Sequence, residues 1–103
     1  MAYDNAALIA LGDPTRQQIL ERLRSGPRAV GEIAAGMTIS RPAVSQHLRV
    51  LKESGLVAER RAGTRHYFAI APEGLGELRA YLDGLWSDAL AAFKRHVEQE
   101  SGS

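Results

Sequence analysis

Residues 39–57 decide the fold and read ISRPAVSQHLRVLKESGLV. Ser40 can cap a helix, because its hydroxyl can accept a hydrogen bond from a free backbone N–H of the first turn. Pro42 suits that first turn, since those N–H groups have no partner within the helix. Gly55 supplies the left-handed residue that ends many helices. These signals predict a helix that begins after Ser40 and ends before Gly55.

The two faces of this helix differ in chemistry. At about 100° per residue, Val44, Leu48 and Leu51 share one face. The residues roughly opposite them are Pro42, Ser45, Gln46 and Arg49. A cationic, amide-bearing face near the N-terminus of a helix is what reading the DNA major groove requires. Taken alone, the helix is equally consistent with a solvated amphipathic helix that reads nothing.

Length and composition indicate one small domain, which we take to span residues 1–103. The 45% apolar and 24% charged content is ordinary for a soluble globular protein. No apolar run approaches the roughly 20 residues of a membrane span, and residues 1–5 lack the features of a signal peptide. The chain has no cysteine, which excludes disulfides and thiolate metal sites. We therefore expect a cytoplasmic protein whose small core gains stability by pairing with a copy of itself.

The net charge of +1 conceals a segregation of charge along the chain. Residues 41–66 carry six basic and two acidic side chains, whereas residues 72–100 carry three basic and six acidic ones. A basic segment favours phosphate through counterion release. Charge runs of this kind are also typical of simple solvated faces.

The remaining elements follow from capping and from the period of the apolar residues. Asp13 and Pro14 start a second helix, which ends at residues 25–27, after a first helix over about 5–11. A short helix over 30–35 and the helix after Ser40 form a helix-turn-helix over about 30–54. Strand-like segments at 56–61 and 65–70 flank a turn at 62–64. A final helix is expected over about 72–97, followed by a frayed tail.

This order predicts a mainly α fold with a small two-stranded β wing, a winged helix-turn-helix. Such folds also serve as protein-interaction modules that never bind DNA, so fold alone does not decide function. The cationic wing and the glutamine-bearing helix favour DNA. The interaction module remains the alternative.

Five pieces of the chain, in order, resemble the ArsR-type (ArsR/SmtB) family of bacterial winged-helix regulators. They are residues 11–20, residues 30–34, residues 40–48, residues 55–57, and Gly63 with Tyr67, within a similarity over about 7–70. The resemblance implies homodimers that bind near-palindromic operators, usually as repressors, through a dimer interface of the first and last helices. One departure is Thr38, where the family often has glycine. Since a β-branched residue resists positive φ, we expect Gly36 to shape that turn.

The resemblance also implies sensor sites, and this chain lacks most of their ligands. The family's cysteine site falls on residues 30–34, which contain none. Its second site, on the final helix, would keep Asp83 and His96 but would have Leu85 and Gln99 as their partners. We therefore predict no metal cofactor. A small-molecule inducer, bound for example beside Trp86, stays open.

The sequence contains no paired carboxylates, nucleophile triad or glycine-rich phosphate loop, so we predict that the protein is not an enzyme. The predicted partners are double-stranded DNA and a second copy of the chain. Leu75 and Leu78 are expected to face the core. The predicted DNA contacts are Arg41, Pro42, Ser45, Gln46, His47, Arg49, Arg60, Arg61 and Arg65. The predicted dimer-interface residues are Leu8, Leu11, Leu82, Leu85, Trp86, Ala89 and Phe93.

Overall fold

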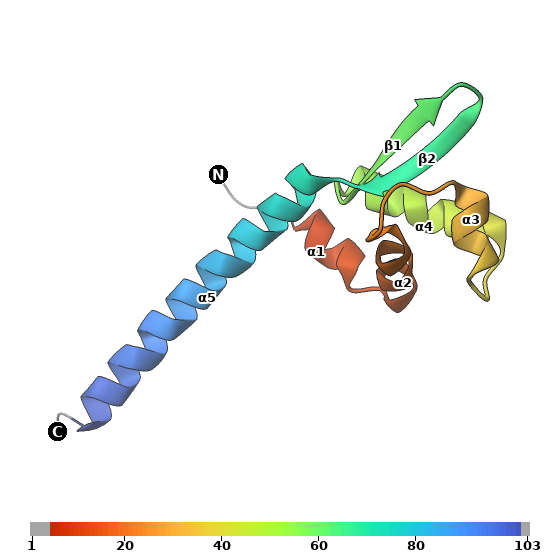
Figure 1. Ribbon diagram of the computed structural model, residues 1–103. Coiled ribbons are helices and arrows are strands. Elements are labelled where there is room, and N and C mark those ends of the chain that lie inside the picture. The colour runs from red at the N-terminus through yellow and green to blue at the C-terminus, as the bar shows by residue number, and fades with distance from the viewer. Residues whose placement is uncertain (1–4, 102–103) are drawn as a thin grey trace.

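Five helices and one β-hairpin follow one another in the predicted order (Figure 1). The computed structural model describes residues 5–101. The elements are α1 (Ala6–Leu11), α2 (Pro14–Leu23), α3 (Val30–Ala35), α4 (Arg41–Glu53), β1 (Val57–Ala62), β2 (Arg65–Ile70) and α5 (Pro72–Ser101). This architecture confirms the predicted fold class.

The predicted helix signals are present as hydrogen bonds and backbone angles. The Asp13 carboxylate accepts from the backbone N–H of Arg16 at 2.9 Å, which caps α2. The Ser40 hydroxyl accepts from the N–H of Ala43 at 3.3 Å, which caps α4. Gly55 adopts a φ of 85° after α4, so the chain turns there into the hairpin. Local chemistry therefore fixes both ends of α4.

Helix α4 contributes most to the core. Its Val44, Leu48 and Leu51 are at most 1% exposed. They pack with side chains from α1, α2, α3 and the hairpin base, and burying each contributes roughly 1.5–3 kcal/mol. The other buried members of this cluster are Ala7, Ala10, Ile19, Leu23, Ile33, Leu56, Val57 and Leu78.

The wing is an antiparallel hairpin that pairs Val57 with Ile70 at its base and Ala62 with Arg65 at its tip. It begins one residue later than predicted, because Leu56 is buried and its N–H bonds back to Leu51 O at 3.0 Å. Arg28 and Phe68 exchange two backbone hydrogen bonds of 2.9 and 2.8 Å, which anchor β2 to the segment between α2 and α3. The backbone of the hairpin is therefore attached to the body near its base.

The prediction for the turn before α4 is wrong in its mechanism. Gly36 has a φ of −97°, and positive φ among residues 5–101 occurs only at Gly26, Gly55 and Gly63. The Arg22 guanidinium occupies the space where a Cβ of Gly36 would lie, and it donates to Gly36 O. Glycine at position 36 therefore leaves room for the Arg22 side chain, and its backbone is not left-handed.

Helix α5 is longer and less covered than predicted. It continues to Ser101, whose hydroxyl donates to Val97 O at 3.0 Å, so the expected fraying of residues 98–101 is wrong. Residues 102–103 lie outside the described part. Leu78 is buried, but Leu75 is 46% exposed, so only one of the two expected inward residues reaches the core. Although α5 has 30 residues, no helix within residues 5–101 is long and apolar enough to cross a membrane.

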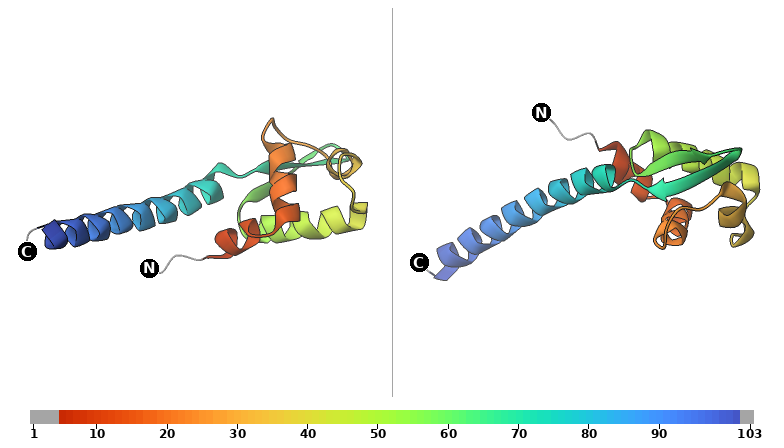
Figure 2. Two further views of the ribbon diagram at one scale, coloured as in Figure 1. Left: turned by 90° about the horizontal axis from the view of Figure 1, so that it is seen from below. Right: turned by 45° about the horizontal axis from the view of Figure 1, so that its top comes forward.

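Most of α5 projects away from the body (Figures 1 and 2). The molecule is accordingly elongated, with extents of 68 × 29 × 22 Å. The wing lies at one end of the long axis and the C-terminal half of α5 at the other (Figure 1). The two surfaces that the sequence marks as functional are therefore well separated.

Candidate nucleic-acid interface

The outward face of α4 carries the side chains predicted to read DNA. Pro42, Ser45, Gln46 and Arg49 are exposed, opposite the buried apolar stripe of the same helix. Arg49 forms a surface ion pair with Glu53 at 3.1 Å. Exposed ion pairs of this kind contribute little to stability, so a competing phosphate can replace the carboxylate. The face thus combines an amide, a hydroxyl and an exchangeable guanidinium.

Arg41, at the first position of α4, lies against α3. A Cβ added to Gly31 would stand 3.6 Å from its Nη1, an ordinary contact distance. Arg41 is exposed and lies at the edge of this outward face of α4. This position suits a backbone phosphate better than a base edge.

His47 lies elsewhere than the other predicted contacts. Its side chain is 26% exposed, and its Nδ1 lies 3.9 Å from Asp13 Oδ2 and 3.5 Å from Arg16 Nη1. Arg16 also donates from Nε to Ala10 O at 2.7 Å, which ties this cluster to the end of α1. The backbone hydrogen bond from Arg16 and the nearby cationic groups hold the pKa of Asp13 below its ordinary value. His47 thus lies where α4 packs against the corner between α1 and α2.

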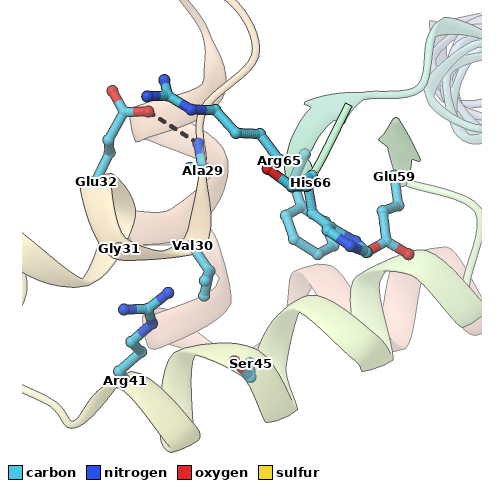
Figure 3. A pocket seen from close by; sticks show the side chains of 11 residues that line it. Ala29, Val30, Gly31, Glu32, Arg41, Ser45, Glu59, Arg65 and His66 are labelled. Atoms are coloured by element: carbon cyan, nitrogen blue, oxygen red, sulfur yellow. Dashed lines mark hydrogen bonds and ion pairs between the residues drawn. The ribbon is translucent and has the colours of Figure 1, made fainter. Parts of the chain in front are cut away.

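The three wing arginines are exposed and stand on different faces of the hairpin. Arg60 is paired with Tyr67 and Arg61 with His66, so these two arginines point to opposite sides. A hydrogen bond to Tyr67 raises the pKa of Arg65, and the charge of Glu32 adds to the effect. Figure 3 shows Arg65 reaching across from the wing toward Glu32 on α3.

Two open grooves separate α4 from the wing. One, of about 790 Å³, lies toward α3 and is lined by Arg41 and Arg65, among others (Figure 3). The other, of about 480 Å³, lies toward the C-terminal half of α4 and is lined by Arg49 and Lys52. Ser45, Glu59 and Phe68 border both grooves. The two grooves together bring Arg41, Ser45 and Arg49 of α4 and Arg65 of the wing to one side of the molecule, whereas Gln46, Arg60 and Arg61 line neither groove.

Lys52, Glu59 and His66 form a cluster that the sequence did not reveal. Glu59 Oε1 accepts from Lys52 Nζ, and Glu59 Oε2 accepts from His66 Nδ1, both at 2.9 Å. These hydrogen bonds, His66 first and then Lys52, hold the pKa of Glu59 below its ordinary value. In the sequence, Glu59 was only one of two acids in a basic segment. Glu59 meets His66 only through the pairing of β1 with β2, which the sequence pattern does not specify.

A second exposed surface is apolar. Trp86 and Phe93 on α5 are 66% and 67% exposed. Leu82, Leu85, Ala89 and Leu8 are also exposed, while Leu11 packs against the core. Ile9 on α1 and Leu90 and Val97 on α5 are also exposed but were absent from the predicted interface. The helical spacing of Leu90 and Val97 with Phe93 was the signal that could have found them.

The predicted half-ligands of a metal site lie apart and have other partners. Asp83 Oδ2 is 3.8 Å from Arg79 Nε, and His96 Nε2 is 3.2 Å from Glu100 Oε1. Within residues 5–101, no group of three or more metal-ligating side chains comes together. The predicted absence of a metal site is thus left to experiment.

The sequence of this chain is similar to those of known bacterial transcriptional regulators. The family model described as "Bacterial regulatory protein, arsR family" matches residues 13–59. The chain is 50% identical over 91 residues to HTH-type transcriptional regulator Rv2034 of Mycobacterium tuberculosis, covering 88% of this chain and 85% of that protein. It is 36% identical over 66 residues to the transcriptional repressor SdpR of Bacillus subtilis, covering 64% and 73% respectively.

One solved structure is similar to this chain in both fold and sequence. It is the solution NMR structure of the homodimeric winged helix-turn-helix DNA-binding domain Mb0332 of Mycobacterium bovis. The match has a TM-score of 0.65 and 38% identity, and it covers 82% of this chain and 79% of that one. The chain belongs to the ArsR family of bacterial winged helix-turn-helix transcriptional regulators.

Proposed function

We propose that the protein is a homodimeric, sequence-specific DNA-binding repressor that recognises a near-palindromic operator. The observation that carries this proposal is the outward face of α4, where Ser45, Gln46 and Arg49 stand exposed beside a cationic wing. A major groove about 12 Å wide accepts such a helix. Repression is supported by the similarity to SdpR, which is named a transcriptional repressor.

The dimer is supported by the apolar surface of α1 and α5. A surface with Trp86 and Phe93 two-thirds exposed is an aggregation hazard unless another molecule covers it. A two-fold interface would cover the same face on both copies. The similar Mycobacterium bovis domain is a homodimer.

Each exposed polar group receives a role from its position. Gln46 can pair bidentately with adenine, Arg49 with guanine or a phosphate, and Ser45 with either kind of acceptor. Arg41 and Pro42, at the start of α4, lie beside the DNA backbone. Arg60, Arg61 and Arg65 meet flanking phosphates or the minor groove. His47 supports the reading helix from behind, because Asp13 and Arg16 cover its Nδ1.

The proposed activity is regulation and not catalysis, in keeping with a family of transcriptional regulators. We assign no metal cofactor, because Leu85 and Gln99 occupy the positions that would complete a metal site with Asp83 and His96 on α5. An organic inducer at the dimer interface would be the regulatory partner. Titrating zinc, nickel and cobalt into the DNA complex checks the metal assignment, and more than about a tenfold loss of affinity on stoichiometric binding would contradict it.

The test of the proposed function is binding to duplex DNA at several salt concentrations. We expect tight binding to a duplex selected from a random-sequence library, weaker binding to random duplex, and a steep loss of both with salt. Absence of binding at low salt would contradict the proposal. That result would favour a winged-helix module that binds protein instead.

A further inference from the structure

The wing has a side-chain attachment to α4 in addition to its backbone anchor. Its anchor to the α2–α3 segment is the backbone exchange between Arg28 and Phe68. Beyond that point the strands become exposed toward the tip, and a two-stranded hairpin is marginally stable alone. Glu59 is paired with Phe68, level with that anchor, where β1 changes from half-buried to exposed. Its side chain can therefore reach both α4 and the more distal part of β2.

Glu59 joins three segments through its two oxygens. Oε1 accepts from Lys52 in the last turn of α4, and Oε2 accepts from His66 on β2, both at 2.9 Å. Since an ionised carboxylate can only accept, His66 Nδ1 is the donor. The Glu59 side chain is 26% exposed, which shields these charge-assisted bonds in part from water. The cluster thus ties the reading helix to both strands of the wing.

The position of this carboxylate is unfavourable for any role in contacting DNA. Glu59 borders both grooves between α4 and the wing, where phosphates would repel it. Its pairing also occupies Lys52, which would otherwise be a phosphate ligand. The contacts that this carboxylate makes with Lys52 and His66 give it a structural role at that position.

We propose that Glu59 is a positioning residue of the DNA interface, which sets the wing against α4 through Lys52 and His66. This inference rests on the proposed function, because the wing is positioned for DNA. Arg61 is the predicted DNA contact whose position depends on Glu59. It is paired with His66 across the hairpin and follows Glu59 by two positions on the same face. Without Glu59, the wing should sample many angles and Arg61 should no longer have a fixed place.

The first arm of the test needs no DNA. Hydrogen exchange of the wing amides between residues 58 and 69 is compared in the native chain, Glu59→Gln and Lys52→Met. We expect about tenfold faster exchange in the wing of both variants, the scale of removing one charge-assisted hydrogen bond, with α2 and α4 unchanged. The matched control is Glu53→Gln, which removes an α4 carboxylate paired only with Arg49. Unchanged wing exchange in both variants would overturn the proposal.

The second arm is a double-mutant cycle on DNA affinity, with the selected duplex as the probe. Arg61→Ala should weaken binding in the native background and have less than about half that effect in the Glu59→Gln background. It should keep its full effect in the Glu53→Gln background. Independent, multiplicative effects of Glu59→Gln and Arg61→Ala would overturn the proposal.

The charge swap of Lys52→Glu with Glu59→Lys supplies a rescue. Each single change should loosen the wing, and the pair should restore part of its protection, because the α4–wing bridge is rebuilt with the charges exchanged while the acceptor for His66 Nδ1 is lost. Failure of the pair to improve on either single change counts against the proposal. If the native chain binds no DNA, the proposed function fails, and the exchange arm alone still decides whether Glu59 holds the wing.

Discussion

Helices α4 and α5 both carry an apolar stripe, but only α4 buries its stripe within the chain. Val44, Leu48 and Leu51 on α4 are almost fully covered. On α5, Leu78 alone is buried, and Trp86 and Phe93 stand free of the body. The two stripes have the same periodicity, so the pattern shows that a face will be covered and not which molecule covers it. For α5 we assign that role to a second copy.

The largest expected effect is the loss of the dimer on placing a charge in the α5 stripe. Trp86→Glu would bury an unpaired charge at the two-fold interface, which costs several kcal/mol of association free energy. Sedimentation should show monomers at micromolar concentration, with an unchanged far-ultraviolet circular dichroism spectrum because Trp86 packs little in the single chain. Ala91→Glu, on the opposite side of α5, is the control and should remain dimeric. If Trp86→Glu dimerised as tightly as the native chain, the α5 stripe would not be the dimer interface.

A matched pair of truncations separates the two stripes energetically. In the Trp86→Glu monomer, Leu51→Ala should lower the free energy of unfolding by roughly 2–5 kcal/mol, because it leaves a cavity in the core. Leu85→Ala removes the same atoms from an exposed site on α5 and should change that free energy little. Urea denaturation measures both. Equal losses would show that α5 packs onto its own chain.

Gln46→Ala tests whether the outward face of α4 reads sequence. We expect relaxed preference at one base pair per half-site, at a cost of roughly 1–3 kcal/mol per site. The measurement compares affinities for the selected duplex and its single-base variants. Gln18→Ala, an exposed glutamine on α2, should leave discrimination intact. Intact discrimination in Gln46→Ala would remove the reading role from this face.

Arg65→Ala should have a smaller effect, common to all sequences. If the wing meets phosphate, the slope of log affinity against log salt should flatten by about one unit for each phosphate that the variant no longer neutralises. Arg79→Ala on α5, which breaks a surface pair with Asp83, serves as the control. No change in either affinity or slope would mean that Arg65 serves the contact with Tyr67 and Glu32 alone.

The smallest effect concerns the cap of α2. The pKa of Asp13 is lowered chiefly by the Arg16 backbone hydrogen bond, so the folded state favours the ionised form. Its contribution to stability is present above the pKa of the unfolded chain and is lost as pH falls through the lower folded pKa. Asp13→Asn retains a capping group, but its stability should no longer contain this contribution, which disappears as the pH falls from neutral to below about 4. Thermal unfolding across that range measures it, and identical pH profiles would contradict the assignment.

The features that depend on neighbours along the chain were predictable. Ser40, Pro42 and Gly55 define α4, and Asp13 with Pro14 defines the start of α2, because caps act on the backbone beside them. The outward position of Gln46 follows from the helical period alone. The sequence therefore predicts the order of the elements and which side chains of α4 face outward.

The features that depend on how segments meet were not predictable. The covering of His47 by Asp13 and Arg16 needs the α1–α2 corner, and the Lys52–Glu59–His66 cluster needs the hairpin register. Gly36 was predicted to have a left-handed backbone, but it instead makes room for Arg22, which approaches from another helix. Leu75 was expected to be buried, yet α5 leaves the body too early to cover it.

The most direct test of the central claim is the dependence of affinity on half-site spacing. If exposed α5 faces pair two copies, two α4 helices enter successive major grooves about 34 Å apart. We predict that two chains bind a selected duplex whose half-site centres are about ten base pairs apart, and that five inserted base pairs, about half a helical turn, reduce the affinity to that for random duplex. Equal affinity for both duplexes, or binding of a single chain, would contradict the account.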